Sequence, residues 1–286
     1  MATQLTPEAA PLRALSPDMA MAVVGEIDRR LDRLVREQAV AVPLAIESGS
    51  RAWGFPSPDS DYDCRFVFIR SRDRYLSPWP SRDVIELPLE GEFDVNGWDL
   101  GKALKLMLKG NAVILEWLQS PIVYRGDAGF RDEFLALARR HVSREALGLH
   151  YLHLGEGQWR KHFGDGQTEV PIKKAFYLLR PAAVLRWMAH HPDQVVPPMN
   201  FVTLVGSCAM PPAVADAVAE LLERKAVTRE LGSATPPSWL ADFVHREFAL
   251  AHAWLDPAFV RTTAEARQDA EAFFRRSIER FGPSGV

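Results

Sequence analysis

The stretch IESGSRAWGFPSPDSDYDCRFVFI, residues 46–69, decides the fold and concentrates the chemistry of this chain. A small-residue turn, Gly49-Ser50, leaves one apolar run, and Asp61 and Asp63 lead into a second one. Successive side chains of a strand point to opposite faces, so both aspartates are expected on one side of the strand. Their oxygens suit magnesium, and the turn offers backbone N–H groups and a hydroxyl to a phosphate. The stretch therefore predicts a phosphate cradle beside a metal site.

Three other interpretations of this stretch have less support. A calcium loop requires glycine and glutamate where Cys64 and Arg70 stand. A serine-nucleophile elbow requires the pattern G-x-S-x-G, which the residues around Ser50 do not form. A solvated loop with a capping aspartate remains open as an alternative. It is disfavoured because Asp63 lies next to a fully apolar strand, where an idle carboxylate is costly.

The composition is that of a soluble globular protein of 286 residues, with 47% hydrophobic and 25% charged residues. The net charge of −3 argues against general coating of nucleic acid. The two cysteines, Cys64 and Cys208, cannot form a disulfide framework, and no Cys/His spacing matches a zinc site. The first residues lack the features of a signal peptide, and no apolar run is long enough for a membrane span. We therefore expect a cytoplasmic protein without a membrane partner.

The pattern changes character near residue 129, which predicts an α+β protein with two domains. We expect a loose N-terminal arm over residues 1–15, a mixed sheet flanked by helices over 16–128, and an all-helical domain over 129–286. Ser16-Pro17-Asp18 is a good helix start, with a capping serine, a proline in the first turn and an acid near the positive end. Pro181 lies inside one helical pattern and is expected to kink or split it. The predicted helices of the second part are 130–140, 143–163, 171–190, 212–225, 237–254 and 258–280.

A third carboxylate would turn the predicted metal site into a centre for nucleotidyl transfer. Two metal ions held by two carboxylates clamp the α-phosphate, and a third carboxylate helps to activate the attacking hydroxyl. The candidates are Asp94 and Asp99, which flank the predicted strand from Phe93 to Trp98. Asp99 also stands where the following helix needs an N-cap, whereas Asp94 has no such structural explanation. The residues favour Asp94 and leave Asp99 open.

The chain resembles the DNA polymerase β-type nucleotidyltransferase superfamily through G-S-R-A-x-G followed by D-x-D. Within it, the chain is most similar to the predicted nucleotidyltransferases of the RNA-ligase-associated (YcgL-like) family. The resemblance covers about half of the chain, and its matching segments are ESGSRAWGF (47–55), SPDSDYDCRFVFI (57–69), NGWDLGKALKL (96–106), GNAVILEWLQSPIVY (110–124) and IKKAFYLLRP (172–181). It implies a mixed sheet packed against helices and magnesium-dependent transfer of NMP from an NTP.

Carried onto this sequence, the resemblance implies that Gly49, Ser50 and Arg51 bind the nucleotide and that Asp61, Asp63 and Asp94 hold two Mg²⁺ ions. Asp99 is the alternative third carboxylate. The predicted helix 171–190 adds four residues that either reach the triphosphate or acceptor, or form a solvated face. They are Lys173, Lys174, Tyr177 and Arg180.

The functional prediction is an enzyme that transfers NMP to a hydroxyl acceptor, with RNA as a possible partner. The association of the family with RNA ligases favours RNA end processing or repair. Two alternatives remain. One is a non-catalytic module that binds nucleotide or RNA, and the other is a transferase that modifies a protein in a toxin–antitoxin system.

Overall fold

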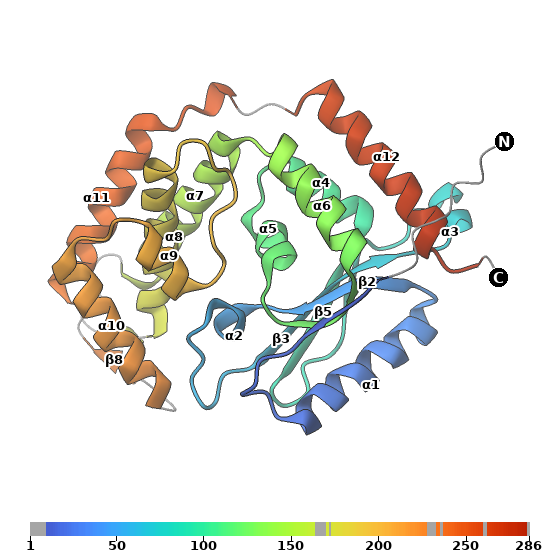
Figure 1. Ribbon diagram of the computed structural model, residues 1–286, viewed down its shortest axis with the longest axis horizontal. Coiled ribbons are helices and arrows are strands. Elements are labelled where there is room, and N and C mark those ends of the chain that lie inside the picture. Colours follow the sequence, from blue (N-terminus) through green and yellow to red (C-terminus); the bar gives the residue numbers. More distant parts are fainter. Residues whose placement is uncertain are drawn as a thin grey trace.

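The computed structural model describes residues 10–163, 170–171, 173–227, 233–234, 237–259 and 262–284 (Figure 1). A six-stranded mixed sheet lies in the N-terminal part, and helices dominate the C-terminal part. The predicted α+β fold class is therefore confirmed. The second sheet that the described residues show has two short strands, β7 (Val170–Pro171) and β8 (Ser233–Ala234).

The large sheet has the strand order β1-β6-β2-β3-β5-β4. The β3–β5 pair is parallel, and every other neighbouring pair is antiparallel. The β3–β5 pair matters most for function, because residues in register on parallel strands emerge side by side. The strands are β1 (Pro11–Ala14), β2 (Ala41–Glu47), β3 (Tyr62–Ile69), β4 (Val84–Glu86), β5 (Phe93–Asp99) and β6 (Val123–Asp127).

Both faces of the central strands are apolar, because helices cover the sheet on both sides (Figure 1). On one face, Phe66 and Phe68 of β3 belong to the same buried cluster as Ile27 and Leu31 of helix α1 (Met21–Gln38). On the opposite face, Val67 belongs to a larger cluster that continues through helices α4 to α8 and beyond. A strand that is buried on both faces has apolar residues at successive positions, which explains the composition of Phe66–Ile69.

The C-terminal helices form a layer that curves back onto the sheet domain (Figure 1). Helix α8 packs on α7 and α11, whereas the last helix, α12, packs on α4, α6 and β3. One hydrophobic core runs through both parts of the chain. The remaining helices are α2 (Gly49–Trp53), α3 (Arg72–Leu76), α4 (Leu100–Leu108), α5 (Ala112–Gln119), α6 (Ala128–His141), α7 (Arg144–His162), α8 (Lys173–His190), α9 (Phe201–Ser207), α10 (Pro212–Val227), α11 (Ser238–Trp254) and α12 (Ala264–Phe281).

Two local predictions need correction, and for a third, at Pro181, the structure excludes a split of the helix. Residues 1–9 lie outside the described residues, but Pro11–Ala14 forms strand β1 on β6, so this part of the arm is not loose. Ser16 does not begin a helix, since it closes a turn in which the Met19 N–H donates to the Ser16 carbonyl (3.1 Å) and α1 starts at Met21. Helix α8 runs through Pro181 without a split. The buried residues around Pro181 offset the cost of about 3 kcal/mol for an internal proline.

Candidate active site

Strand β2 ends in a turn that lies directly on the Asp63 carboxylate. The backbone N–H of Ser48 donates to the Asp63 carbonyl at 2.9 Å, which fixes the end of β2 beside the start of β3. Gly49 then adopts a positive φ of 59°, a conformation that favours glycine. A Cβ atom on Gly49 would lie 2.1 Å from Asp63 Oδ2. Both backbone conformation and space therefore require glycine at this position.

Gly49→Ala is expected to destabilise the protein by about 1–3 kcal/mol, because the new Cβ strains the backbone and displaces the Asp63 side chain. Urea unfolding monitored by circular dichroism measures this change. Gly157→Ala in α7 is the matched control, since no atom lies within 4 Å of its added Cβ. The control should be neutral or stabilising because alanine is the better helix former. Equal stability of wild type and Gly49→Ala would contradict this role of the turn.

Asp63 and Asp94 lie side by side because β3 and β5 are parallel and pair Asp63 with Asp94 in register. Arg65 lies between the two carboxylates, and its Nη2 is 2.8 Å from Asp63 Oδ1 and 2.7 Å from Asp94 Oδ2. Its Nη1 donates to the Asp94 backbone carbonyl at 2.8 Å. The guanidinium is thus fixed by both acids. We call Asp63 and Asp94 the acid pair.

The other two aspartates predicted for the site lie in different places. Asp61 is exposed just before β3, and its charge contributes to raising the pKa of Asp63, so it lies near the acid pair. Asp99 ends β5, far along the strand from Asp94, and pairs in register with Phe68. It caps α4 by accepting from Gly101 N–H at 2.8 Å and also accepts from the Tyr75 hydroxyl at 2.7 Å. The structure therefore brings Asp94, and not Asp99, to Asp63.

Ser50 and Arg51 hold the loop between α2 and β3. The Ser50 hydroxyl donates to the Ser60 hydroxyl at 3.0 Å. The Arg51 guanidinium donates to the carbonyls of Ser60 (2.6 Å) and Asp61 (3.2 Å), and it lies 3.8 Å from the ring centroid of Tyr62. These contacts place both side chains next to the residues that precede the acid pair.

The protonation of the acid pair is shaped by burial and by its neighbours. Burial raises the pKa of Asp63, the Arg65 guanidinium opposes this rise, and the negative charges of Asp94 and Asp61 add to it. Tyr177 of α8 has a raised pKa, mainly through burial, and the charges of Asp63 and Asp61 contribute to it. Tyr177 is nevertheless 38% exposed. Tyr177 also contacts Trp53 of α2, so the helical part reaches the helix that begins at Gly49.

Glu47 is fully buried beside the turn and was not among the residues predicted for the site. Its carboxyl oxygens accept from the Asp63 backbone N–H at 3.0 Å and from the Tyr124 hydroxyl. Burial raises the pKa of Glu47 from its ordinary value of 4.5 to about 7, and these two hydrogen bonds oppose the rise. The sequence carried one signal for it, because a glutamate at the end of an otherwise apolar strand indicates a carboxylate with a specific role. Glu47 supports the backbone of Asp63 from below.

Glu47 should make the stability of the protein fall as pH rises. Its folded pKa of about 7 exceeds the ordinary 4.5, so the folded state binds more protons than the unfolded state between these values. The stabilising contribution is full below about pH 4.5 and is lost as pH rises through about 7. We expect Glu47→Gln to remove up to about 3 kcal/mol of this pH dependence.

The measurement is urea unfolding of wild type and Glu47→Gln from pH 5 to pH 8. The glutamine should match the wild type at low pH and exceed its stability at high pH, because an amide can serve both hydrogen bonds without ionising. The exposed Glu37→Gln is the control and should leave the pH profile unchanged. Parallel profiles for wild type and Glu47→Gln would show that Glu47 does not titrate in this range.

The four residues predicted on α8 do not act as one group. Tyr177 meets Trp53 edge-to-face, with ring centroids 6.2 Å apart, and Lys174 Nζ lies 4.7 Å from the Tyr177 centroid. The side chain of Lys173 lies outside the described residues. Arg180 is buried, with 3% exposure, and does not join the acid pair. Tyr177 and Arg180 thus both lie against Trp53 of α2, with the Arg180 guanidinium 5.0 Å from the Trp53 centroid, whereas Lys174 lies against Tyr177.

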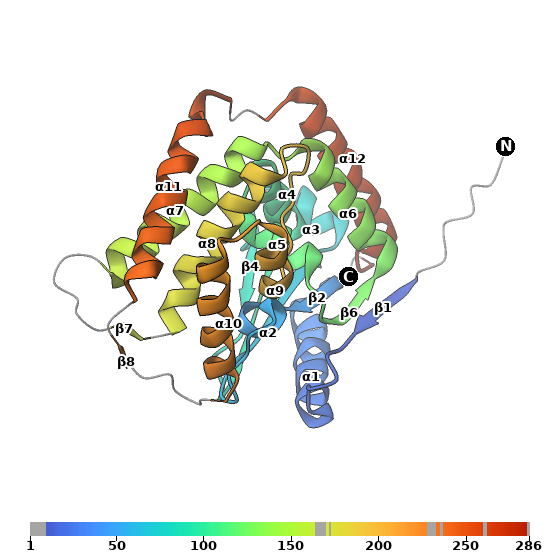
Figure 2. The ribbon, with the colours of Figure 1, turned by 60° about the vertical axis from the view of Figure 1, so that its left-hand side comes forward.

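Arg180 belongs to a buried network centred on Glu116 of α5. Arg180 Nη2 lies 2.9 Å from Glu116 Oε1, and its Nη1 donates to the Met199 carbonyl at 2.7 Å. Trp53 Nε1 and the Tyr151 hydroxyl each donate to Glu116 at 3.0 Å. The network ties α2, which carries the Gly49 turn, to helices α5, α7 and α8. Figures 1 and 2 show α2 beside the α8–α10 region.

Neither a preformed metal cluster nor a membrane helix is present in the described ranges. No group of three His, Cys, Asp or Glu side chains there is arranged to hold a metal ion. No described helix is long and apolar enough to cross a membrane. The donor set at the acid pair is nevertheless of the oxygen type that magnesium prefers, and a cationic guanidinium already lies between the two carboxylates. The residues therefore fit a cation.

The mixed sheet and its acidic edge define a DNA polymerase β-like protein with a fold consistent with nucleotidyl transfer. Residues 23–276 match the model of the RNA repair pathway DNA polymerase beta family, and the chain belongs to this family. A relative from Bacillus subtilis (strain 168), named "Uncharacterized protein YcgL", is 39% identical over 201 residues. These residues are 70% of this chain and 76% of the relative. The family resemblance predicted from the sequence is confirmed.

Proposed function

We propose that the protein is a magnesium-dependent nucleotidyltransferase that transfers NMP from an NTP to a hydroxyl acceptor. The observation that carries the proposal is the Gly49 turn, which lies against Asp63 while Asp63 and Asp94 stand in register on parallel strands. A small-residue turn and a pair of carboxylates thus meet at one edge of the sheet. Membership of a DNA polymerase β-like family supports the same activity.

In this proposal, Asp63 and Asp94 would hold Mg²⁺, and Asp61 would complete the acidic site. When bound, the metal would neutralise charge on the phosphates and on the acceptor oxygen. The turn at Gly49 and Ser50 would bind the β- and γ-phosphates through backbone N–H groups and the hydroxyl. Tyr177, exposed beside this edge, would contact the nucleotide or the acceptor. Asp94 would orient the acceptor hydroxyl and take up its proton. The hydroxyl oxygen would form the new bond to the α-phosphorus as the bond to the leaving pyrophosphate breaks.

We propose RNA as the acceptor, because the matching family is named for an RNA repair pathway. Nucleoside triphosphates and RNA occur together in the cytoplasm, where we expect the protein to act. The test is incubation with Mg²⁺ and each α-³²P-labelled NTP over RNAs with defined 3′ ends, with protein and small-molecule hydroxyls in parallel. Label on RNA with release of pyrophosphate supports the proposal. Label on another acceptor refutes the RNA assignment, and no label on any acceptor refutes transfer itself.

A second candidate is a non-catalytic module that binds nucleotide or RNA. It is favoured by one observation, namely that the Arg65 guanidinium already bridges Asp63 and Asp94. A permanent internal counter-ion would neutralise the acid pair without any metal. The two candidates differ in whether a divalent cation can replace the guanidinium, and Arg65 therefore provides the way to separate them.

Arg65→Gln should make thermal stability depend more strongly on Mg²⁺. Without the guanidinium the two carboxylates repel each other, and a bound cation would relieve this repulsion. At a Mg²⁺ concentration ten times Kd, binding adds about 1.4 kcal/mol, which is a Tm rise of roughly 3–6 °C. Differential scanning calorimetry with and without Mg²⁺ measures this rise. The wild type should show a smaller rise because Arg65 competes with the metal.

Arg125→Gln is the matched control for this experiment. Arg125 also bridges two carboxylates, lying 2.8 Å from Asp32 and 3.6 Å from Asp28, but those belong to α1. Its replacement should leave the Mg²⁺ dependence at the wild-type level. If Mg²⁺ changes the Tm of Arg65→Gln no more than that of Arg125→Gln, the acid pair does not bind the metal and the non-catalytic module is favoured.

A further inference from the structure

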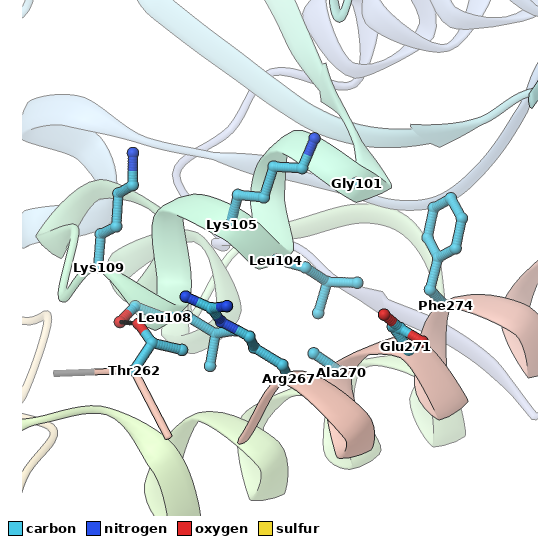
Figure 3. Close-up of a pocket in the computed structure, with 10 residues that line it drawn as sticks. All are labelled: Gly101, Leu104, Lys105, Leu108, Lys109, Thr262, Arg267, Ala270, Glu271 and Phe274. Atoms are coloured by element: carbon cyan, nitrogen blue, oxygen red, sulfur yellow. Dashed lines mark hydrogen bonds between the residues drawn. The ribbon is translucent and has the colours of Figure 1, made fainter. Parts of the chain in front are cut away.

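A pocket of about 440 Å³ lies between α4 and α12, away from the acid pair (Figure 3). Asp94 lies near the start of β5, whereas the pocket begins at Gly101, just beyond the strand's last residue, Asp99. Its volume is within the range of small-molecule sites. The pocket joins the sheet domain to the returning C-terminal helix, and the function proposed for the acid pair does not use it.

The floor of the pocket is apolar and has an aromatic wall. Leu104 and Leu108 of α4 face Ala270 and Phe274 of α12 (Figure 3). The Phe274 ring is fixed by an edge-to-face contact with Tyr75, with centroids 5.0 Å apart. Such a wall suits a flat ring, because aromatic side chains stack on nucleobases at roughly 1–3 kcal/mol per base.

The floor also depends on glycine at position 101. A Cβ atom on Gly101 would lie 3.5 Å from Phe274 Cε2 and 3.1 Å from Asp99 Oδ1. Glycine thus leaves the space next to the Phe274 ring open. The wall and the space beside it are both present before any ligand binds.

Three cationic side chains border the pocket. Lys105 of α4 and Lys109, the C-cap of that helix, line one rim with their side chains extended away from α12, and the Arg267 guanidinium reaches from α12 toward α4 (Figure 3). None of them has an acidic partner within 4 Å among the described residues. The carboxylate that lines the pocket, Glu271, is paired with Arg275 at 3.0 Å. Like charges four residues apart on a helix, as at Lys105 and Lys109, repel each other, and a bound anion would offset this repulsion.

We propose that the α4–α12 pocket binds a nucleotide unit, with the base against Phe274 and the phosphate at the rim, where the long Lys105, Lys109 and Arg267 side chains can turn toward it. Three cations suit a phosphate better than a single carboxylate, since guanidinium and ammonium groups form strong charge-assisted hydrogen bonds to phosphate oxygens. The apolar floor and the Phe274 ring would contact the base of the nucleotide. The unit is either a free mononucleotide or one nucleotide of an RNA strand, and both share this chemistry.

Lysine footprinting tests the site without requiring catalysis. The wild-type protein is acetylated with an N-hydroxysuccinimide ester, and the modification of each lysine is followed by mass spectrometry. The probes are AMP, adenosine, inorganic phosphate and a 5′-phosphorylated RNA oligonucleotide. We expect AMP or the RNA to slow acetylation of Lys105 and Lys109 severalfold, whereas the exposed Lys161 on α7 keeps its rate. Adenosine and phosphate alone should protect much less.

Two charge-matched triple variants complete the test by calorimetric titration of the same probes. Lys105→Gln, Lys109→Gln and Arg267→Gln together should remove the binding that the footprint detects. The control replaces three exposed arginines, Arg33, Arg36 and Arg160, by glutamine and should retain it. Protection by RNA at concentrations where AMP has no effect identifies a strand, and protection by AMP alone identifies a free nucleotide. Equal protection by phosphate alone, equal protection of Lys161, or no protection at all overturns the proposal, whatever the outcome at the acid pair.

Discussion

If the proposed transfer takes place at the acid pair, replacing Asp63 or Asp94 with asparagine is expected to slow it by about 10³-fold or more. Each change would remove a charged ligand of the proposed Mg²⁺, whose stabilisation of the transition state is several kcal/mol. The assay is single-turnover transfer of label from an α-³²P-labelled NTP to the best acceptor. Asparagine keeps the size of the side chain, so the packing around Gly49 is preserved. The loss should appear in the rate of transfer with little change in Tm.

Asp99→Asn is the matched control for this prediction. Asparagine is as good an N-cap as aspartate, because its Oδ1 can still accept from Gly101, where Asp99 Oδ1 does now. Its amide NH2 can donate to the Tyr75 hydroxyl, which now donates to Asp99 Oδ2, so transfer should remain near the wild-type rate. This comparison also decides the third carboxylate. If Asp99→Asn abolishes transfer while Asp94→Asn leaves it intact, the assignment of the acid pair is wrong.

Glu116→Ala is expected to destabilise the protein by about 3–5 kcal/mol, the usual effect of leaving one partner of a buried ion pair uncompensated. The Arg180 side chain is 4% exposed and that of Glu116 is 12% exposed, so water cannot replace the missing carboxylate easily. Trp53 and Tyr151 would lose their acceptor at the same time. Urea unfolding of the purified protein measures the change.

Glu133→Ala is the control for this network. Glu133 is also a helical glutamate paired with an arginine, Arg276, but its side chain is 49% exposed. An exposed pair contributes at most about 1 kcal/mol, so the control should unfold nearly as the wild type does. Similar losses in the two variants would show that the Glu116 network is not a major source of stability. A double variant, Glu116→Leu with Arg180→Met, should recover part of the loss because it removes both buried charges.

The sequence predicted the elements of the sheet well where local patterns are strong. The apolar run Phe66–Ile69 and the helical spacing of Leu100–Leu108 both formed as expected. Strand β1 was missed because its four residues have no pattern of their own and owe their extended conformation to pairing with β6. The Ser16 turn was taken for a helix start because the same residue types serve both structures.

The sequence predicts the parts of the site that lie in one short segment, but not the contacts between distant segments. Gly49 and the two aspartates at the start of β3, Asp61 and Asp63, are recognisable from spacing, but the choice between Asp94 and Asp99 depends on the register of β5 on β3. Arg180 was predicted to bind nucleotide from the helical face it shares with Tyr177. Its actual partner, Glu116, is 64 residues away in the sequence, and no local pattern connects the two.

The most direct test of the acid pair is a crystal of the protein soaked with Mn²⁺ and a non-hydrolysable NTP, with anomalous scattering used to locate the metal. We expect a peak at bonding distance from both Asp63 and Asp94, with the Arg65 guanidinium displaced from between them and the triphosphate against the Gly49-Ser50 turn. An ordered NTP with no metal peak at the acid pair, and with Arg65 still bridging Asp63 and Asp94, would contradict it.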